Sequence, residues 1–182
     1  CATPTLHQLL THTSGLSYSF NSGLLPEEMK KERLDFHPSG SALENVCNKL
    51  ATLPLAFAPG VGWEYSVSID VIGRVVEMIS GQSLDQFFHK EIFQPLGIDG
   101  LGFNFDASMS GRIASLYTSL AGDPMDLNTA RKDSEITQNT GPRLRLVDEE
   151  EGSPFWDTRL FSGGGGLIGT LDGYMRFAEA LR

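Results

Sequence analysis

The feature that most constrains this chain is the run from Ser68 to Ser80, in which apolar residues recur at intervals of three and four. Residues at that spacing share one face of an α-helix. Gly81 follows directly, and glycine is the favoured residue at the left-handed position that ends a helix. The sequence therefore predicts a helix over residues 68–80 with an inward apolar stripe, made of Ile69, Ile72, Val75, Val76 and Ile79.

Four further segments show helical spacing, at residues 5–12, 41–53, 83–93 and 170–181. The first three begin with a hydroxyl residue followed three positions later by Glu or Gln, the pattern of a capping box. Thr170 is the predicted N-cap of the last. The capping pairs are Thr5 with Gln8, Ser41 with Glu44, and Ser83 with Gln86. The residues predicted to face the core are Leu6, Leu9, Leu10, Leu43, Val46, Cys47, Leu50, Leu53, Leu84, Phe87, Phe88, Ile92, Leu171, Tyr174, Phe177, Ala178 and Leu181.

Strands are a minor part of the expected fold. Residues 101–105 and 143–147 alternate apolar and small or polar residues, which predicts two short strands. Turn-forming residues between them predict a long irregular segment over residues 120–158. Because the sequence has no repeat or low-complexity linker, we expect residues 1–182 to form a single unit that is mostly α with short β segments.

Composition limits the classes of partner. The 14 Lys and Arg residues stand against 23 Asp and Glu, a net charge of −9, without a basic cluster that could follow a phosphate backbone. Nucleic acid is therefore not an expected partner. No apolar run approaches the roughly 18 residues that cross a bilayer, so we expect no membrane insertion and a soluble chain, either cytoplasmic or periplasmic. The two cysteines lack metal-ligand spacing, and we expect no metal and no cofactor.

A search for nucleophilic catalysis finds no complete site. The chain contains no Ser-x-x-Lys, no Gly-x-Ser-x-Gly and no Lys-Thr-Gly. Its histidines are widely spaced, which favours packing or surface roles over metal binding. One segment is informative, Pro59-Gly-Val-Gly-Trp-Glu-Tyr-Ser-Val67, in which Tyr65 precedes the helix predicted at residues 68–80. A phenol placed there can project from a rigid element into a site, although spacing alone favours a core tyrosine over a catalytic one.

Five segments, taken in order, carry a family resemblance. They are residues 6–16 (LHQLLTHTSGL), residues 59–70, residues 73–83, residues 92–98 (IFQPLGI) and residues 162–170 (SGGGGLIGT). In that order and spacing the chain resembles the serine β-lactamase-related family, which includes class C β-lactamases, D-alanyl-D-alanine peptidases and family VIII carboxylesterases. The resemblance implies the helical lobe and adjoining loops of a serine β-lactamase-like α/β fold, truncated at both ends.

The resemblance also implies residue roles. Tyr65 matches the tyrosine of the family's Tyr-x-Asn motif, which shuttles the proton of the nucleophilic serine. The Ser-x-x-Lys motif and the third motif of the family fall outside this chain, so the chain alone is expected to be inactive. The implied substrate-binding residues are Ser66, Val67, His12, Gly164 and Gly165.

Three of these positions allow more than one interpretation. Val67 stands where the lactamase branch has Asn, and an apolar side chain cannot hydrogen-bond a substrate amide, which favours the carboxylesterase branch. The run Gly163–Gly166 lacks the lysine and the layout of a nucleotide-binding loop, so close backbone approach to a substrate or a neighbouring strand is the better interpretation. The segment around His12 either lines the site or ends a helix, with Gly15 as the terminating residue.

The sequence thus favours a serine hydrolase that forms an acyl-enzyme on short-chain carboxylic esters. The alternatives are a β-lactamase or D-alanyl-D-alanine carboxypeptidase, and a catalytically inactive relative that binds a ligand or partner. The expected partner is a small-molecule ester or amide.

Overall fold

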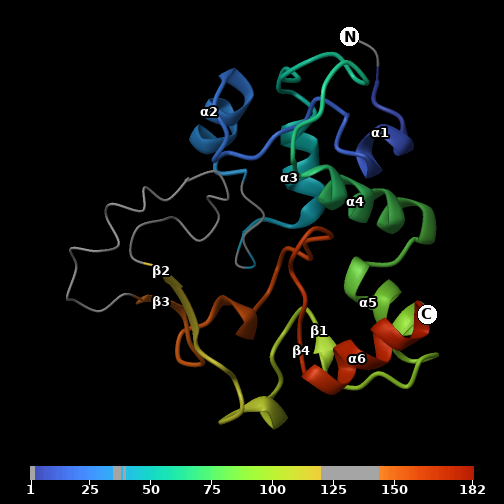
Figure 1. Ribbon diagram of the computed structural model, residues 1–182, viewed down its shortest axis with the longest axis vertical. Helices are drawn as coiled ribbons and strands as arrows, with labels where there is room; N and C mark the ends of the chain where they lie inside the picture. The colour runs from blue at the N-terminus through green and yellow to red at the C-terminus, as the bar shows by residue number, and fades with distance from the viewer. Residues whose placement is uncertain (1–2, 35–37, 39, 120–143) are drawn as a thin grey trace.

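Helix α4 (Ser68–Ser80) is the centre of the packing in the computed structural model, which describes residues 3–34, 38, 40–119 and 144–182. It contacts α1, α3 and α5. Figure 1 shows α1, α3 and α4 gathered in the upper part of the molecule, with α5, α6 and the β1–β4 pair below. The helix bounds are Leu6–Leu10 for α1, Leu24–Lys31 for α2, Leu43–Leu50 for α3, Leu84–Phe88 for α5 and Leu171–Ala180 for α6.

The helix predicted at residues 68–80 is confirmed at both ends. Gly81 follows it in the left-handed conformation, with φ at +69°, and donates its N–H to the carbonyl of Glu77. The capping box of α1 is also confirmed, because the Thr5 hydroxyl accepts from the Gln8 N–H while the Gln8 side chain accepts from the Thr5 N–H. Thr170 caps α6 as predicted, accepting from the N–H of Gly173.

The other two predicted capping boxes are wrong. Ala42, not Ser41, precedes α3, and no side chain caps that helix. The Glu44 carboxylate instead pairs with Arg74 of α4 at 2.5 Å. Ser83 likewise makes no side-chain cap to α5. Both predictions failed for the same reason. A local sequence pattern does not show which distant group folding brings into place, here Arg74 beside the Glu44 carboxylate and Glu77 at the first amide of α5.

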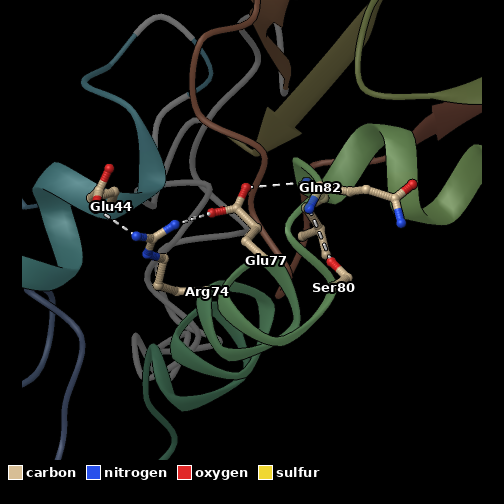
Figure 2. Close-up of polar contacts among 6 residues, drawn as sticks. Glu44, Arg74, Glu77, Ser80 and Gln82 are labelled. Carbon is tan, nitrogen blue, oxygen red and sulfur yellow. Dashed lines mark hydrogen bonds and ion pairs between the residues drawn. The ribbon is translucent and has the colours of Figure 1, made fainter.

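The first amide of α5 is held by a side chain from α4. Glu77 Oε1 accepts the Leu84 N–H at 3.1 Å, while its second oxygen pairs with Arg74 at 3.1 Å. Figure 2 shows Arg74 between the carboxylates of Glu44 and Glu77.

The segment predicted as one helix over residues 83–93 is α5 followed by a π-helical turn, His89–Phe93. Helix α2 was not predicted, since Gly23 precedes it and offers no side-chain cap.

The strands form two small antiparallel pairs. Strand β1 (Leu101–Gly102) pairs with β4 (Ile168–Gly169), and β2 (Leu116–Ser119) pairs with β3 (Leu144–Asp148). Only the first two residues of the strand predicted at residues 101–105 pair. The chain then leaves the sheet, because Phe105 N–H donates to the Phe155 carbonyl at 2.8 Å. Much of the irregular segment predicted at residues 120–158, and the first residue of the strand predicted at 143–147, lie outside the described residues.

The core is mainly aliphatic and lies among α1, α2, α3 and the chain that precedes α4. Several residues predicted to face the core do not. In α1 only Leu9 is buried, and in α6 and at the end of α4 the predicted inward residues reach solvent. Helical spacing fixes which residues share a face but not whether another element covers that face. The buried cluster consists of Leu9, Leu16, Leu25, Met29, Leu34, Leu43, Val46, Leu50, Val67 and Leu160; the exposed exceptions are Leu6, Leu10, Ile79, Leu171, Tyr174 and Leu181.

Candidate functional site

Two segments far apart in sequence lie side by side at the site, residues 12–17 after α1 and residues 56–67 before α4. Backbone hydrogen bonds join them, from Gly60 N–H to the Thr13 carbonyl at 2.8 Å and from Glu64 N–H to the His12 carbonyl at 3.0 Å. Their close approach explains Gly15, whose φ is +85° and where a Cβ atom would lie 2.2 Å from the Phe57 carbonyl oxygen. The segment does end α1, as the sequence allowed, but with Thr11 as the C-cap and His12 as the left-handed residue, so the choice of Gly15 as the terminating residue is wrong.

Tyr65 lies three residues before α4 and is 40% exposed. Its ring lies between two others, with centroid distances of 5.0 Å to His12 and 5.1 Å to Tyr18. Its backbone carbonyl accepts a hydrogen bond from the Asn21 amide at 3.2 Å. The phenol thus combines a fixed ring position with access to solvent, the combination that a proton-transfer group requires.

His12 is the sequence-predicted site residue that the structure brings to Tyr65. Besides the ring contact, His12 Nδ1 lies 3.2 Å from Ser66 Oγ and accepts the Ser66 N–H at 3.3 Å. Burial lowers the pKa of the His12 imidazole below its ordinary value. His12, Tyr65 and Ser66 therefore form one contiguous group, although 54 residues separate His12 from Ser66.

Ser66 and Val67 are buried rather than exposed. The Ser66 hydroxyl bonds Ser68 Oγ at 2.7 Å as well as His12, and Val67 belongs to the aliphatic core. Both side chains therefore have structural roles among the described residues. The substrate contacts that the resemblance implied for them stay predictions, since neither side chain reaches the surface here.

Gly164 and Gly165 are exposed, and Gly164 contacts Asp70 in the first turn of α4. The buried Asp70 carboxylate accepts hydrogen bonds from the Ser162 hydroxyl and, at 3.1 Å, from the Gly164 N–H. Burial raises the pKa of Asp70, while these two hydrogen bonds oppose that shift. A Cβ on Gly164 would come within 2.8 Å of Asp70 Oδ2. The glycine run thus allows close approach to α4 rather than to a strand.

Two residues next to the site were not singled out from the sequence. Tyr18 packs against Tyr65, and burial, the negative charge of Asp70 and the adjacent phenol raise its pKa above the ordinary value. Asp70 links the glycine run to α4, because its carboxylate accepts the Gly164 N–H. An acidic residue in the first turn of a helix is usually explained by the helix dipole, so the sequence carried no separate signal for this role.

Neither a metal site nor a membrane span is indicated in the part of the chain that the structure describes. No three His, Cys, Asp or Glu side chains gather there as metal ligands. None of the described helices is long and apolar enough to cross a membrane.

Comparison with known proteins shows which fold family this arrangement of helices and short strands belongs to. The sequence model of the beta-lactamase family matches residues 2–182, so the chain belongs to this family. Esterase EstB of Burkholderia gladioli is 32% identical over 181 residues, which cover 98% of this chain and 44% of that protein. Acyltransferase mokF of Monascus pilosus is 38% identical over 177 residues, which cover 97% of this chain and 37% of that protein.

A solved structure agrees. Simvastatin synthase (LovD) from Aspergillus terreus, unliganded, has a TM-score of 0.67 and 29% sequence identity, covering 100% of this chain and 38% of that one. The chain therefore spans less than half the length of these relatives. The mostly helical fold with short strands is confirmed as part of a serine β-lactamase-like fold.

Proposed function

We propose that the full-length protein carrying this chain hydrolyses short-chain carboxylic esters through an acyl-enzyme, with Tyr65 as the proton shuttle. The observation that carries the proposal is the placement of Tyr65, half-exposed, between two rings and three residues before α4. Membership of the beta-lactamase family and the similarity to an esterase support the reaction class.

In this mechanism a serine hydroxyl attacks the ester carbonyl while its proton passes to the Tyr65 oxygen. Tyr65 then returns that proton to the departing alkoxide, and water repeats the cycle on the acyl-enzyme. A free phenol has a pKa of about 10, so it needs a nearby cation to act as a base. The described neighbours of its ring are the aromatic His12 and Tyr18, which orient the phenol. We infer that the serine and its lysine belong to a Ser-x-x-Lys motif elsewhere in the full-length protein.

Esters are favoured over amides for two reasons. The position of the family's substrate-binding Asn holds Val67, which offers no polar atom to an amide. Esters also need less help for the leaving group. In this proposal His12, Gly164 and Gly165 border the substrate, and the exposed backbone of the glycines allows an acyl group close approach.

The similarity to mokF supports a second candidate, transfer of the acyl group to an alcohol instead of water. Hydrolysis of p-nitrophenyl butyrate, with and without an added alcohol, separates the two through the ratio of ester to free acid. Nitrocefin tests the β-lactamase alternative in the same assay. Faster turnover of nitrocefin than of the ester would contradict the proposed substrate class, and no turnover of either would support an inactive binding protein.

The role of Tyr65 is tested by Tyr65→Phe in the full-length protein. Loss of the hydroxyl should lower kcat by roughly 10²- to 10⁴-fold with KM nearly unchanged, because the missing group acts in the transition state. Tyr174→Phe is the control: it removes an exposed phenol on α6, and kcat should stay unchanged. Near-normal kcat for Tyr65→Phe would contradict the assignment.

A further inference from the structure

His12 has a left-handed backbone conformation, which is uncommon for any residue other than glycine. Its φ is +55°, and among the described non-glycine residues only Arg33 shares a positive φ. His12 N–H donates to the Leu9 carbonyl and Thr13 N–H to the Gln8 carbonyl, the Schellman pattern that ends α1. Glycine or asparagine is usual at this position, and another L-residue costs roughly 1–2 kcal/mol there. The backbone hydrogen bonds of the Schellman pattern and the contacts of the His12 side chain together offset that cost.

Those contacts fix the protonation state of the ring. The Ser66 backbone N–H, which can only donate, points at His12 Nδ1 from 3.3 Å. Nδ1 must then carry a lone pair, and the ring proton is on Nε2. His12 is consequently neutral, in agreement with the effect of burial on its pKa.

The same nitrogen ends a buried chain of hydroxyl groups. Leu16 N–H donates to Ser14 Oγ at 3.2 Å, and 2.7 Å separates Ser14 Oγ from Ser68 Oγ and Ser68 Oγ from Ser66 Oγ. Because Leu16 can only donate and His12 Nδ1 can only accept, each hydroxyl accepts from one side and donates towards the ring. Without an acceptor at His12, the buried Ser66 N–H would lose its partner, a loss that costs about 1–3 kcal/mol.

The peptide between Tyr65 and Ser66 is thus held at both of its polar atoms. Asn21 donates to the Tyr65 carbonyl at 3.2 Å, and His12 accepts the Ser66 N–H. The His12 ring also touches the Tyr65 ring, with 46° between the two planes. A single side chain therefore controls the backbone and the ring of the residue assigned to proton transfer.

We propose that neutral His12 is a positioning residue for Tyr65, holding the Tyr65–Ser66 peptide through Nδ1 and the phenol through its ring face. The proposal rests on the proposed role of Tyr65 as the proton shuttle. It assigns His12 no proton transfer of its own. A misplacement of about 1 Å can lower a rate by as much as about 10²-fold, which sets the size of the effect to expect.

Two variants of the full-length protein separate the contacts. His12→Gly tolerates the left-handed backbone and removes the side chain, so kcat on p-nitrophenyl butyrate should fall about 10- to 100-fold with KM nearly unchanged. His12→Asn tolerates the same backbone and puts an amide oxygen near the position of Nδ1, so it should recover most of kcat. Thermal melting identifies any variant that is unfolded. If His12→Gly is unfolded, the ¹⁵N spectrum of the unsubstituted protein remains as the test, because it reports the position of the His12 ring proton without a substitution.

A double variant distinguishes this proposal from the proposed function. Since His12 acts through Tyr65, adding His12→Gly to Tyr65→Phe should lower kcat little further. Normal kcat in Tyr65→Phe alone would overturn the proposed function. A large loss in Tyr65→Phe with no loss in His12→Gly would overturn only the positioning role. The positioning role is also overturned by additive losses in the double variant, by equal losses in His12→Asn and His12→Gly, or by a ¹⁵N spectrum that shows a proton on His12 Nδ1.

Discussion

Helices α4 and α6 have similar apolar spacing in the sequence but opposite environments in the structure. Helix α4 contacts three other helices, and its first turn is enclosed. Helix α6 touches the β1 region through Gly173, where a Cβ atom would lie 3.1 Å from a Leu101 side-chain carbon. Most of its large apolar side chains are exposed, namely Leu171, Tyr174 and Met175, and so is Leu181 directly after it.

The comparison shows that burial in α4 does not follow its apolar stripe. The buried residues of α4 are Ser68, Asp70 and Gly73, while Ile79 is exposed. Small and polar residues are enclosed because the hydroxyl chain, the glycine run and α5 all come close at that end of the helix. Which residues of α4 are buried therefore depends on contacts with segments distant in sequence, and apolar periodicity carries no information about those contacts.

The largest expected difference between the two regions is in unfolding free energy. Leu84 of α5, packed beside Gly73 of α4, is 0% exposed, and Leu171 of α6 is 80% exposed. Leu84→Ala should lower the free energy of unfolding by about 2–5 kcal/mol, and Leu171→Ala by less than about 0.5 kcal/mol. Urea unfolding measures both. Equal losses would show that the apolar face of α6 is covered by something beyond the described residues.

A second difference should appear within the glycine run. A Cβ on Gly163 would lie 2.7 Å from the Ile69 carbonyl oxygen, whereas nothing lies within 4 Å of one on Gly165. Gly163→Ala should destabilise the protein by about 1–3 kcal/mol, because backbone must move. Gly165→Ala is the matched control and should be close to neutral. If both are neutral, the glycine run does not pack against α4 as described.

The smallest expected effect is a pH dependence caused by Asp70. Burial raises its pKa in the folded state, so between the unfolded value of about 3.9 and the folded value the native protein binds more protons. This group therefore makes unfolding easier as pH rises through that window. Asp70→Asn should remove that contribution, and its unfolding free energy should improve relative to the parent as pH rises from about 4. An unchanged difference across this range would contradict the raised pKa.

Much of the helical structure was predictable because its signals are local. The bounds of α4, the left-handed Gly81 and the capping box of α1 depend on residues within a few positions of one another. Strand β2 and the pairing of β1 with β4 depend on partners distant in sequence, for which short alternating segments carry little information. The predicted caps at Ser41 and Ser83 failed for a related reason, since α3 has no side-chain cap and Glu77 takes the first amide of α5.

The candidate site was predicted in part. The family resemblance named Tyr65 and His12, and the structure brings their rings together. The sequence did not predict the burial of Ser66 and Val67, nor the hydrogen bond from the Gly164 N–H to Asp70. Each depends on which loop packs over the first turn of α4. Sequence order also gave no reason to pair Asn21 with the Tyr65 carbonyl.

The hydrogen bond from the Leu84 N–H to the Glu77 carboxylate links the local opening of α5 to that of α4. Helix α5 has five residues, far fewer than the roughly 12–15 that an isolated helix needs to be even marginally stable. Its first N–H depends on a carboxylate of α4, and its buried Leu84 lies beside Gly73 of the same helix. The two helices should therefore behave as one cooperative unit in native-state hydrogen exchange, with the amides of α5 exchanging only when the end of α4 also opens.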